Sequence, residues 1–192
     1  MFLKKILLII GGGISAYKSL DLIRELKQEN FQVIPVITKS GSMFVTPLSL
    51  TTLSENTVYA DIFDYEKESQ ISHIKLAREA DIIVVAPATA DLIAKFANGI
   101  ADDLATTIFL ASYSKKIIVP AMNVAMWANN STKRNVETLR NDGIIIVGPE
   151  EGQMACGEYG VGRISENKNI INSIITSERK EVLIKLCKLL QR

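Results

Sequence analysis

The chain has few of the residues that build covalent frameworks or metal centres. Its 192 residues include two cysteines, Cys156 and Cys187, and a single histidine, His73. Two cysteines in unlike contexts are too few for a disulfide framework, so a reducing, cytoplasmic location is the economical expectation. A histidine without a nearby cysteine or acidic cluster lacks the partners of a zinc site, and we therefore expect no metal.

Charge of one sign and long apolar runs are missing as well. The formal net charge is +1 and no basic run occurs, which argues against nucleic acid or an anionic membrane as partner. Lys4 and Lys5 before an apolar segment resemble a secretory leader, but that segment is short and ends in glycines. No apolar stretch approaches the ~20 residues that a membrane span needs. We expect the first segment to be a strand.

What the chain does have is a regular alternation of apolar, β-branched runs with helical patterns. The runs are apolar throughout, which is typical of parallel strands covered on both faces. The length suits one domain, residues 1–192, and the class is doubly wound α/β: a Rossmann or flavodoxin-like, mostly parallel sheet flanked by helices. The expected strands are residues 5–10, 31–38, 82–86, 117–119 and 144–147, and the main helices 15–29, 90–96, 103–111 and 132–141.

Two local features refine this prediction. Pro35 removes one hydrogen-bond donor from the second strand, which indicates an edge position or a bulge. Residues 178–192 have the apolar spacing of an amphipathic helix, and we expect that helix to pack on this domain or on a neighbouring subunit.

The turn after the first strand is rich in glycine. Gly11-Gly12-Gly13-Ile14-Ser15-Ala16 fits G-x-G-x-x-G/A, in which backbone N–H groups at a helix start hold phosphate. A dinucleotide site would add an acidic residue after the second strand, and residues 31–54 contain none. Thr38-Lys39-Ser40 stands there instead, which favours the terminal phosphate of a mononucleotide such as FMN. Ser15 either donates to that phosphate or only caps the helix.

A second segment, Ala86-Pro87-Ala88-Thr89-Ala90-Asp91, follows the third expected strand. Small residues and proline allow a flat ring to approach the backbone, and Thr89 and Asp91 offer polar contacts. The structural alternative is that Thr89, and Asp102 further on, only cap helices.

A third segment, Pro120-Ala121-Met122-Asn123-Val124-Ala125-Met126-Trp127, follows the fourth strand. It places an amide, two thioethers and the only tryptophan where ligands bind in open α/β sheets. Asn123 and Trp127 are four residues apart, so a helix starting here puts them on one face. The alternative is a strand-to-helix corner filled by methionine and tryptophan.

Residues 153–163 contain three glycines and Cys156, and we expect a mobile loop that covers a small-molecule site. An accessible thiol there acts as an acid, a nucleophile or a redox group, or is an ordinary free cysteine. His73 follows Ser72, which suits the cap of a short helix. Its reference pKa of about 6.5 makes it the natural proton-transfer group near neutral pH, and a structural histidine is the alternative.

Taken in order, these segments resemble the homo-oligomeric, flavin-containing cysteine decarboxylases. The marks are the glycine-rich turn, the lone His73, Ala-Pro-Ala-Thr-Ala at 86–90, Gly-Ile-Ala-Asp-Asp-Leu at 99–104, Pro-Ala-Met-Asn-x-x-Met-Trp at 120–127 and Ala-Cys-Gly-Glu-x-Gly-x-Gly-Arg at 155–163. The resemblance extends over nearly the whole chain to about residue 169.

The resemblance implies a tightly bound FMN and a set of residue roles. His73 would be the catalytic base and Cys156 the proton donor, while Asn123 would bind the substrate carboxylate with Met126 and Ala155 beside it. The cofactor would be surrounded by Gly13, Ile14, Ser15, Thr38, Ser40 and Phe44 at its phosphate, and by Pro87, Ala88, Thr89, Ala90 and Ala121 at its ring.

The implied activity is decarboxylation of a phosphorylated cysteine amide, 4′-phosphopantothenoylcysteine, to 4′-phosphopantetheine in coenzyme A biosynthesis. Transient oxidation of the thiol by FMN lets CO₂ loss leave its charge on sulfur. Relatives that decarboxylate peptidyl-cysteine stop at the enethiol and lack a cysteine such as Cys156, so its presence favours the full cycle. The family also implies a homo-oligomer, a trimer or dodecamer. A peptidyl-cysteine decarboxylase, a flavin prenyltransferase and a non-catalytic flavin-binding subunit stay as alternatives.

Overall fold

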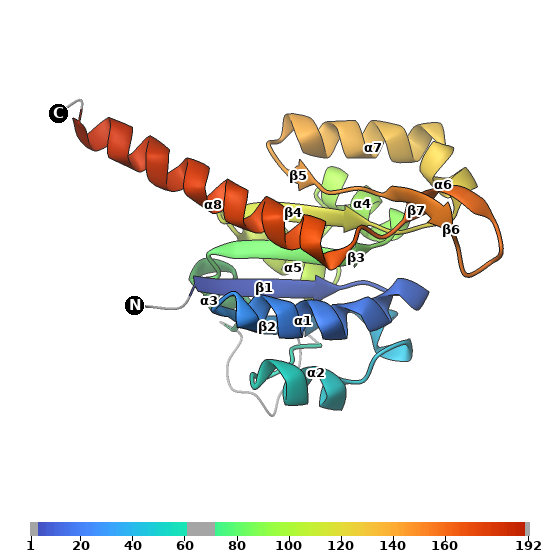
Figure 1. Ribbon diagram of the computed structural model, residues 1–192, viewed down its shortest axis with the longest axis horizontal. Coiled ribbons are helices and arrows are strands. Elements are labelled where there is room, and N and C mark those ends of the chain that lie inside the picture. Colours follow the sequence, from blue (N-terminus) through green and yellow to red (C-terminus); the bar gives the residue numbers. More distant parts are fainter. Residues whose placement is uncertain (1–3, 61–71, 191–192) are drawn as a thin grey trace.

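A five-stranded parallel sheet forms the centre of the computed structural model, which describes residues 4–60 and 72–190, with side chains for 4–60 and 74–178 (Figure 1). The strand order is β2-β1-β3-β4-β5. This order confirms the predicted doubly wound, flavodoxin-like class. The strands are β1 (Lys4–Ile10), β2 (Phe31–Ile37), β3 (Ile82–Ala88), β4 (Lys115–Pro120) and β5 (Ile145–Ile146).

Helices cover both faces of the sheet, which explains why the strands are apolar throughout. Leu8 of β1 is fully buried on one face and Leu7 on the other, because successive side chains point to opposite sides. The first face is covered by α1 (Lys18–Gln28), α2 (Pro47–Ser54) and the start of α8 (Asn167–Leu190), and the second by α3 (Ser72–Glu79), α4 (Ala90–Ala97), α5 (Leu104–Ala111) and α7 (Asn130–Asn141).

The edge position predicted from Pro35 is confirmed. β2 is the outer strand of the sheet, and Tyr59 bridges its outer side: the Tyr59 N–H donates to the Pro35 carbonyl at 3.1 Å. The N–H and C=O of one strand residue point to the same side, so the missing Pro35 donor faces away from β1. The missing N–H of Pro35 therefore removes no hydrogen bond between β1 and β2.

The helix starts partly match the expected caps. Thr89 caps α4, accepting a hydrogen bond from the Leu92 N–H at 3.2 Å. The expectation for Asp102 is wrong, because Asp103 directly precedes α5 and accepts from the Thr106 N–H at 2.8 Å. Asp102 instead lies 3.1 Å from the Lys95 ammonium, and that hydrogen bond lowers the pKa of the Asp102 carboxyl.

The segment expected to be a mobile loop is a β-hairpin. β6 (Glu150–Gln153) pairs antiparallel with β7 (Tyr159–Arg163), and only residues 154–158 form the connecting turn. Gly162 lies so close to the Met122 carbonyl oxygen that a Cβ would overlap it, and the Met122 N–H donates to the Gly162 carbonyl at 3.0 Å. The glycine that suggested mobility instead permits close contact with the segment after β4.

Helix α8 begins well before the predicted 178–192 helix. Its first turns bury Ile170, Ile171 and Ile174 against the sheet, and its ribbon then extends past the sheet (Figure 1). The expected helix is the second half of α8 as far as Leu190, and its side chains from residue 179 lie outside the described ones. Among the described residues, none of the helices combines the length and apolar character needed to cross a bilayer.

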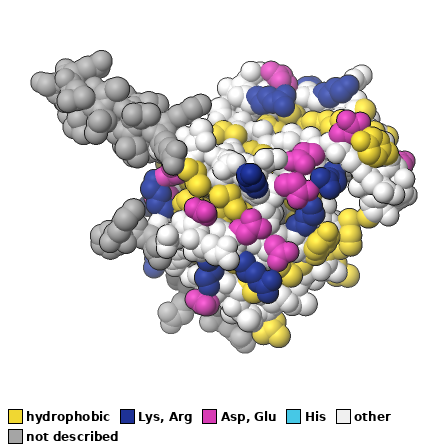
Figure 2. Space-filling model, viewed as in Figure 1, with side chains coloured by type: hydrophobic (Ala, Val, Ile, Leu, Met, Phe, Trp, Pro, Cys, Tyr) yellow, Lys and Arg dark blue, Asp and Glu magenta, His cyan; other side chains and the backbone are white. Residues whose placement is uncertain are grey.

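Acidic and basic side chains are interspersed over the face seen in Figure 2.

Candidate active site

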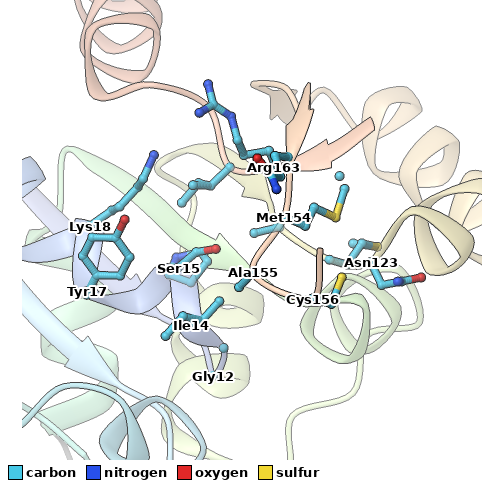
Figure 3. Close-up of a pocket in the computed structure, with 17 residues that line it drawn as sticks. Gly12, Ile14, Ser15, Tyr17, Lys18, Asn123, Met154, Ala155, Cys156 and Arg163 are labelled. Atoms are coloured by element: carbon cyan, nitrogen blue, oxygen red, sulfur yellow. The ribbon is translucent and has the colours of Figure 1, made fainter. Parts of the chain in front are cut away.

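A cavity of about 440 Å³ opens at the carboxyl ends of β1, β3 and β4 (Figure 3). The chain turns to opposite sides of the sheet after β1 and β3, which makes this the topological switch point where open α/β sheets bind ligands. Tyr17 and Lys18 lie at one side of the cavity, and Asn123 and Cys156 lie at the other (Figure 3).

The glycine-rich end of the cavity, residues 12–15, is built from backbone. The Gly11 N–H donates to the Pro87 carbonyl at 3.1 Å, which ties the turn after β1 to β3. Gly12 packs on the loop after β2, where an added Cβ would lie 2.5 Å from the Ser40 Cβ. Within the described part of the chain, the N–H groups of residues 12–15 have no hydrogen-bond acceptor. These donors precede a helix, and together with the Ser15 hydroxyl they suit a phosphate.

Ser15 is not a helix cap, so the capping interpretation of this residue is wrong. It lies inside the 3-10 turn η1 (Ile14–Tyr17), which leads directly into α1. A cap must precede the first helical residue, and that place belongs to Gly13.

The wall between the two ends is apolar and small. Pro87 and Ala121 line the cavity, and the Ala121 N–H donates to the Ala88 carbonyl at 3.0 Å. This bond holds the loops after β3 and β4 side by side. A planar ring fits against a wall without projecting side chains, so phosphate donors and a flat apolar surface occur together, as FMN requires.

The hairpin end of the cavity, Asn123 with residues 154–158, is built from side chains. Asn123 caps the short helix α6 (Val124–Ala128): its Oδ1 accepts from the Ala125 N–H at 2.8 Å. The Trp127 N–H donates to the Asn123 carbonyl at 3.0 Å, which confirms the helical start predicted here. The Asn123 Nδ2 donates to the Glu158 carboxylate across the turn that carries the exposed Cys156. An amide donor and a thiol thus line one cavity.

A charged cluster fastens the base of the hairpin to the start of α8. The Arg163 guanidinium donates to Glu166 at 2.8 Å and lies 3.5 Å from Glu150. Burial disfavours the charged form of Glu150, but its neighbours outweigh that cost and hold the pKa of this carboxyl below its usual range. They are the Asn169 amide, the Glu166 N–H, the Ser165 hydroxyl and the charge of Arg163.

The structure brings many of the sequence-predicted site residues to this cavity. They come from the turn after β1, the ends of β3 and β4, and the hairpin turn. The predicted residues that line the cavity are Gly13, Ile14, Ser15, Pro87, Ala121, Asn123, Ala155 and Cys156.

Other predicted residues are not among the cavity's lining. The Thr38 hydroxyl donates to the Ile10 carbonyl and accepts from the Gly41 N–H, so it holds the loop after β2, with Ser40 beside Gly12. His73 belongs to α3, but its side chain lies outside the described residues. The remaining residues of this group are the buried Ala88, the exposed Phe44 and Met126, and Thr89 and Ala90 at the start of α4. Their ligand contacts stay predictions.

Several lining residues were not predicted as site residues. Lys18 and Tyr17 follow the glycine-rich turn, Met122 precedes Asn123, and Arg163 ends the cysteine-containing motif. Their positions, inside a recognised motif or directly after one, are the signal that marks them. Gln153 and Met154 begin the segment 153–163 that was expected to cover a small-molecule site, and the pairing of β6 with β7 brings them to the cavity. Within the described residues, no group of three His, Cys, Asp or Glu side chains is placed to hold a metal.

Comparison with known proteins places this geometry among relatives. The family model described as Flavoprotein matches residues 3–178. The coenzyme A biosynthesis bifunctional protein CoaBC of Bacillus subtilis (strain 168) is 45% identical over 168 residues, which are 88% of this chain and 41% of that protein. The chain therefore spans about two fifths of the length of this curated relative.

Two solved structures are similar along almost their whole length. A serine-for-cysteine mutant of PPC decarboxylase complexed with pantothenoylaminoethenethiol matches with a TM-score of 0.84 and 32% identity, over 93% of this chain and 100% of that one. The FMN binding protein AtHal3 matches with a TM-score of 0.81 and 32% identity, over 93% and 98%.

The fold and the cavity define a doubly wound α/β protein with a glycine-rich turn of free N–H groups at one end of its cavity and a thiol at the other. The matched family model covers most of the chain. This protein belongs to the flavoprotein family.

Proposed function

We propose that this protein is an FMN-dependent decarboxylase that converts 4′-phosphopantothenoylcysteine to 4′-phosphopantetheine and CO₂ in coenzyme A biosynthesis. One observation carries the proposal. Asn123 and Cys156 line the same end of a cavity, and the backbone N–H groups of residues 12–15 are free hydrogen-bond donors at its other end. The similarity to CoaBC and to PPC decarboxylase supports the same substrate.

The residues present fit FMN. The N–H groups of residues 12–15 and the hydroxyls of Ser15 and Ser40 would hold its phosphate, and Pro87 and Ala121 would face its ring. Thr38 and Phe44 near the phosphate, and residues 88–90 near the ring, complete the proposed set. When bound, FMN supplies a reversible two-electron oxidation of the substrate's CH₂–S unit, so that the charge left by CO₂ loss rests on sulfur.

The chain's own residues supply orientation and proton transfer. The Asn123 Nδ2 would donate to the substrate carboxylate, with Met126 and Ala155 beside it, and so hold the C–CO₂ bond in place. His73 would take the thiol proton, and Cys156 would return a proton when the product is formed. The apolar wall at Pro87 and Ala121 would keep water from the side of the ring that it covers.

The position of Cys156 favours the complete cycle over a peptidyl-cysteine decarboxylase that stops at the enethiol. The thiol lines the cavity together with Asn123, the residue proposed to hold the carboxylate. A proton donor at that place serves the returning step.

We also propose a homo-oligomer, a trimer or dodecamer, in the cytoplasm, formed by one flavoprotein domain whose last helix packs on it or on a neighbour. Exposed apolar side chains next to the loop after β2 support a contact between copies: Met43 is 82% exposed, Leu48 76% and Phe44 48%. Such a cluster is costly on a monomer. Sedimentation of the flavin-loaded protein tests the assembly, and a monomer at micromolar concentration contradicts it.

The activity is tested by adding 4′-phosphopantothenoylcysteine to the FMN-loaded protein and following CO₂ and 4′-phosphopantetheine. We expect one equivalent of each, with the flavin oxidised at the end. A colourless protein that takes up no added FMN would refute the proposal. CO₂ release from peptides ending in cysteine, but not from the pantothenoyl compound, would favour the peptidyl-cysteine alternative.

A further inference from the structure

The side-chain amide of Asn123 already makes a hydrogen bond to a carboxylate of this chain. Its Oδ1 accepts from the Ala125 N–H at 2.8 Å, which fixes the orientation of the amide. Its Nδ2 therefore supplies the donors that remain, and it donates to a carboxylate oxygen of Glu158. The group proposed to bind the substrate carboxylate is occupied by a group of the same chemistry.

Glu158 belongs to the turn that carries Cys156. The Met154 N–H donates to the Glu158 carbonyl at 2.8 Å, and the Gly157 N–H donates to the Met154 carbonyl at 2.9 Å. These bonds close the turn on itself. Among the side chains that the structure describes, the bond from Asn123 to Glu158 is the hydrogen bond that fastens this turn to the start of α6.

Two carboxylates compete for one amide. An amide nitrogen has two donors, and two negative groups that converge on it repel each other. A substrate carboxylate that binds the Asn123 Nδ2 must therefore displace Glu158. Glu158 is exposed, so its carboxylate regains hydration when it leaves, and the exchange is nearly balanced.

We infer that, in the free protein, Glu158 occupies the place of the substrate carboxylate on the Asn123 amide. The hydrogen bond between Asn123 and Glu158, here called the latch, holds the Cys156 turn to Asn123. The substrate carboxylate breaks this bond when it binds. This inference rests on the proposed function for the carboxylate that binds Asn123. Once that carboxylate leaves as CO₂, Glu158 returns to Asn123. The Cys156 turn then closes at the step that requires its proton. Glu158 is thus a positioning residue that acts through Asn123.

The deciding experiment compares ligands that differ only in the carboxylate. FMN-loaded protein is titrated with the serine analogue of 4′-phosphopantothenoylcysteine, which lacks the thiol, and with the carboxamide of that analogue, and the flavin absorbance is followed. In Glu158→Ala we expect the acid to bind about threefold to tenfold more tightly and the carboxamide to bind within twofold of the parent. Glu151→Ala, which removes an exposed carboxylate of the same hairpin, should change neither Kd.

A purely structural role for Glu158 predicts a different pattern. Loss of turn structure would weaken or strengthen both ligands alike, and either result overturns the inference. If Glu151→Ala tightens binding of the acid as much as Glu158→Ala does, the inference is also overturned. The loss of any negative charge from the hairpin would then explain the tighter binding.

The failure of the proposed function gives a separate signature. If the parent protein binds neither pantothenoyl ligand, a peptide ending in serine and its C-terminal amide replace them, with the same expected selectivity for the acid. If no ligand of either class binds, the rate of amide hydrogen exchange in residues 154–158 shows whether the bond between Asn123 and Glu158 holds this turn. Both Glu158→Ala and Asn123→Asp, which keeps the cap acceptor, should speed exchange there, and Glu151→Ala should not. Unchanged exchange in the two latch variants overturns the latch.

Discussion

The two ends of the cavity are made in different ways. The glycine-rich end presents backbone N–H groups that are held by β1, β3 and the loop after β2, with Gly12 packed on Ser40. The hairpin end presents the side chains of Asn123, Cys156 and Glu158, two of them on an exposed turn. A cofactor that stays bound suits the rigid end, and a substrate that enters and leaves suits the end whose groups exchange partners.

The largest effect is expected from the loss of His73. This substitution tests whether α3 supplies the catalytic base that acts at the hairpin end of the cavity. For His73→Asn we expect kcat to fall by about 10²- to 10⁴-fold, because a positioned general base contributes that much. The flavin content, read from absorbance, should stay unchanged, since the glycine-rich end is untouched. The control is Lys75→Gln on the same helix, which should turn over normally. Normal turnover by His73→Asn would remove the base assignment.

The next effect concerns the thiol of the hairpin end. For Cys156→Ser we expect formation of 4′-phosphopantetheine to fall about a hundredfold, because the returning step loses its proton donor. CO₂ release should continue for one turnover, leaving the enethiol and reduced flavin, which mass spectrometry and absorbance detect. Cys187→Ser serves as the matched control. Parent-like yield from Cys156→Ser would assign the donor role to another group.

A substitution at the glycine-rich end separates cofactor binding from chemistry. In Gly12→Ala the new Cβ would lie 2.5 Å from the Ser40 Cβ, so the loop after β2 must shift away from the donors. Overpacking of this kind costs about 1–3 kcal/mol, and we expect the Kd of FMN to rise about tenfold to hundredfold in fluorescence titrations. Gly99→Ala is the control, because its positive φ strains alanine at a place where a Cβ meets nothing within 4 Å. Equal loss of FMN in both variants would point to general destabilisation.

The smallest effect is a pH dependence at the base of the hairpin. The pKa of Glu150 is depressed in the folded protein, so its contribution to stability is present above its unfolded pKa of about 4.3 and is lost as pH falls through the lower folded pKa. Glu150→Gln should therefore lower Tm near pH 7, and the difference from the parent should shrink below about pH 4. Calorimetry from pH 3 to 7 measures this, with Glu151→Gln as the control. A Tm difference that stays constant with pH would contradict the charged role.

Much of the fold was predictable because it depends on local pattern. Strands that are apolar on both faces indicated a covered parallel sheet, and Pro35 indicated its edge. The hairpin was not predictable in the same way. Its strands are short and rich in glycine, and β7 is tied through Gly162 to Met122 on a distant segment. Local sequence therefore suggested a loop.

The sequence alone determined the class of fold, the motifs of the site and the family, since periodicity and residue order carry that information. Only the tertiary structure decided which residues share one cavity. It turned the Thr38 hydroxyl inward to support a loop, and it set Glu158 on the amide of Asn123, 35 positions earlier in the chain. Such contacts depend on how separate elements pack in space, and the spacing of residues along the chain does not encode that packing directly.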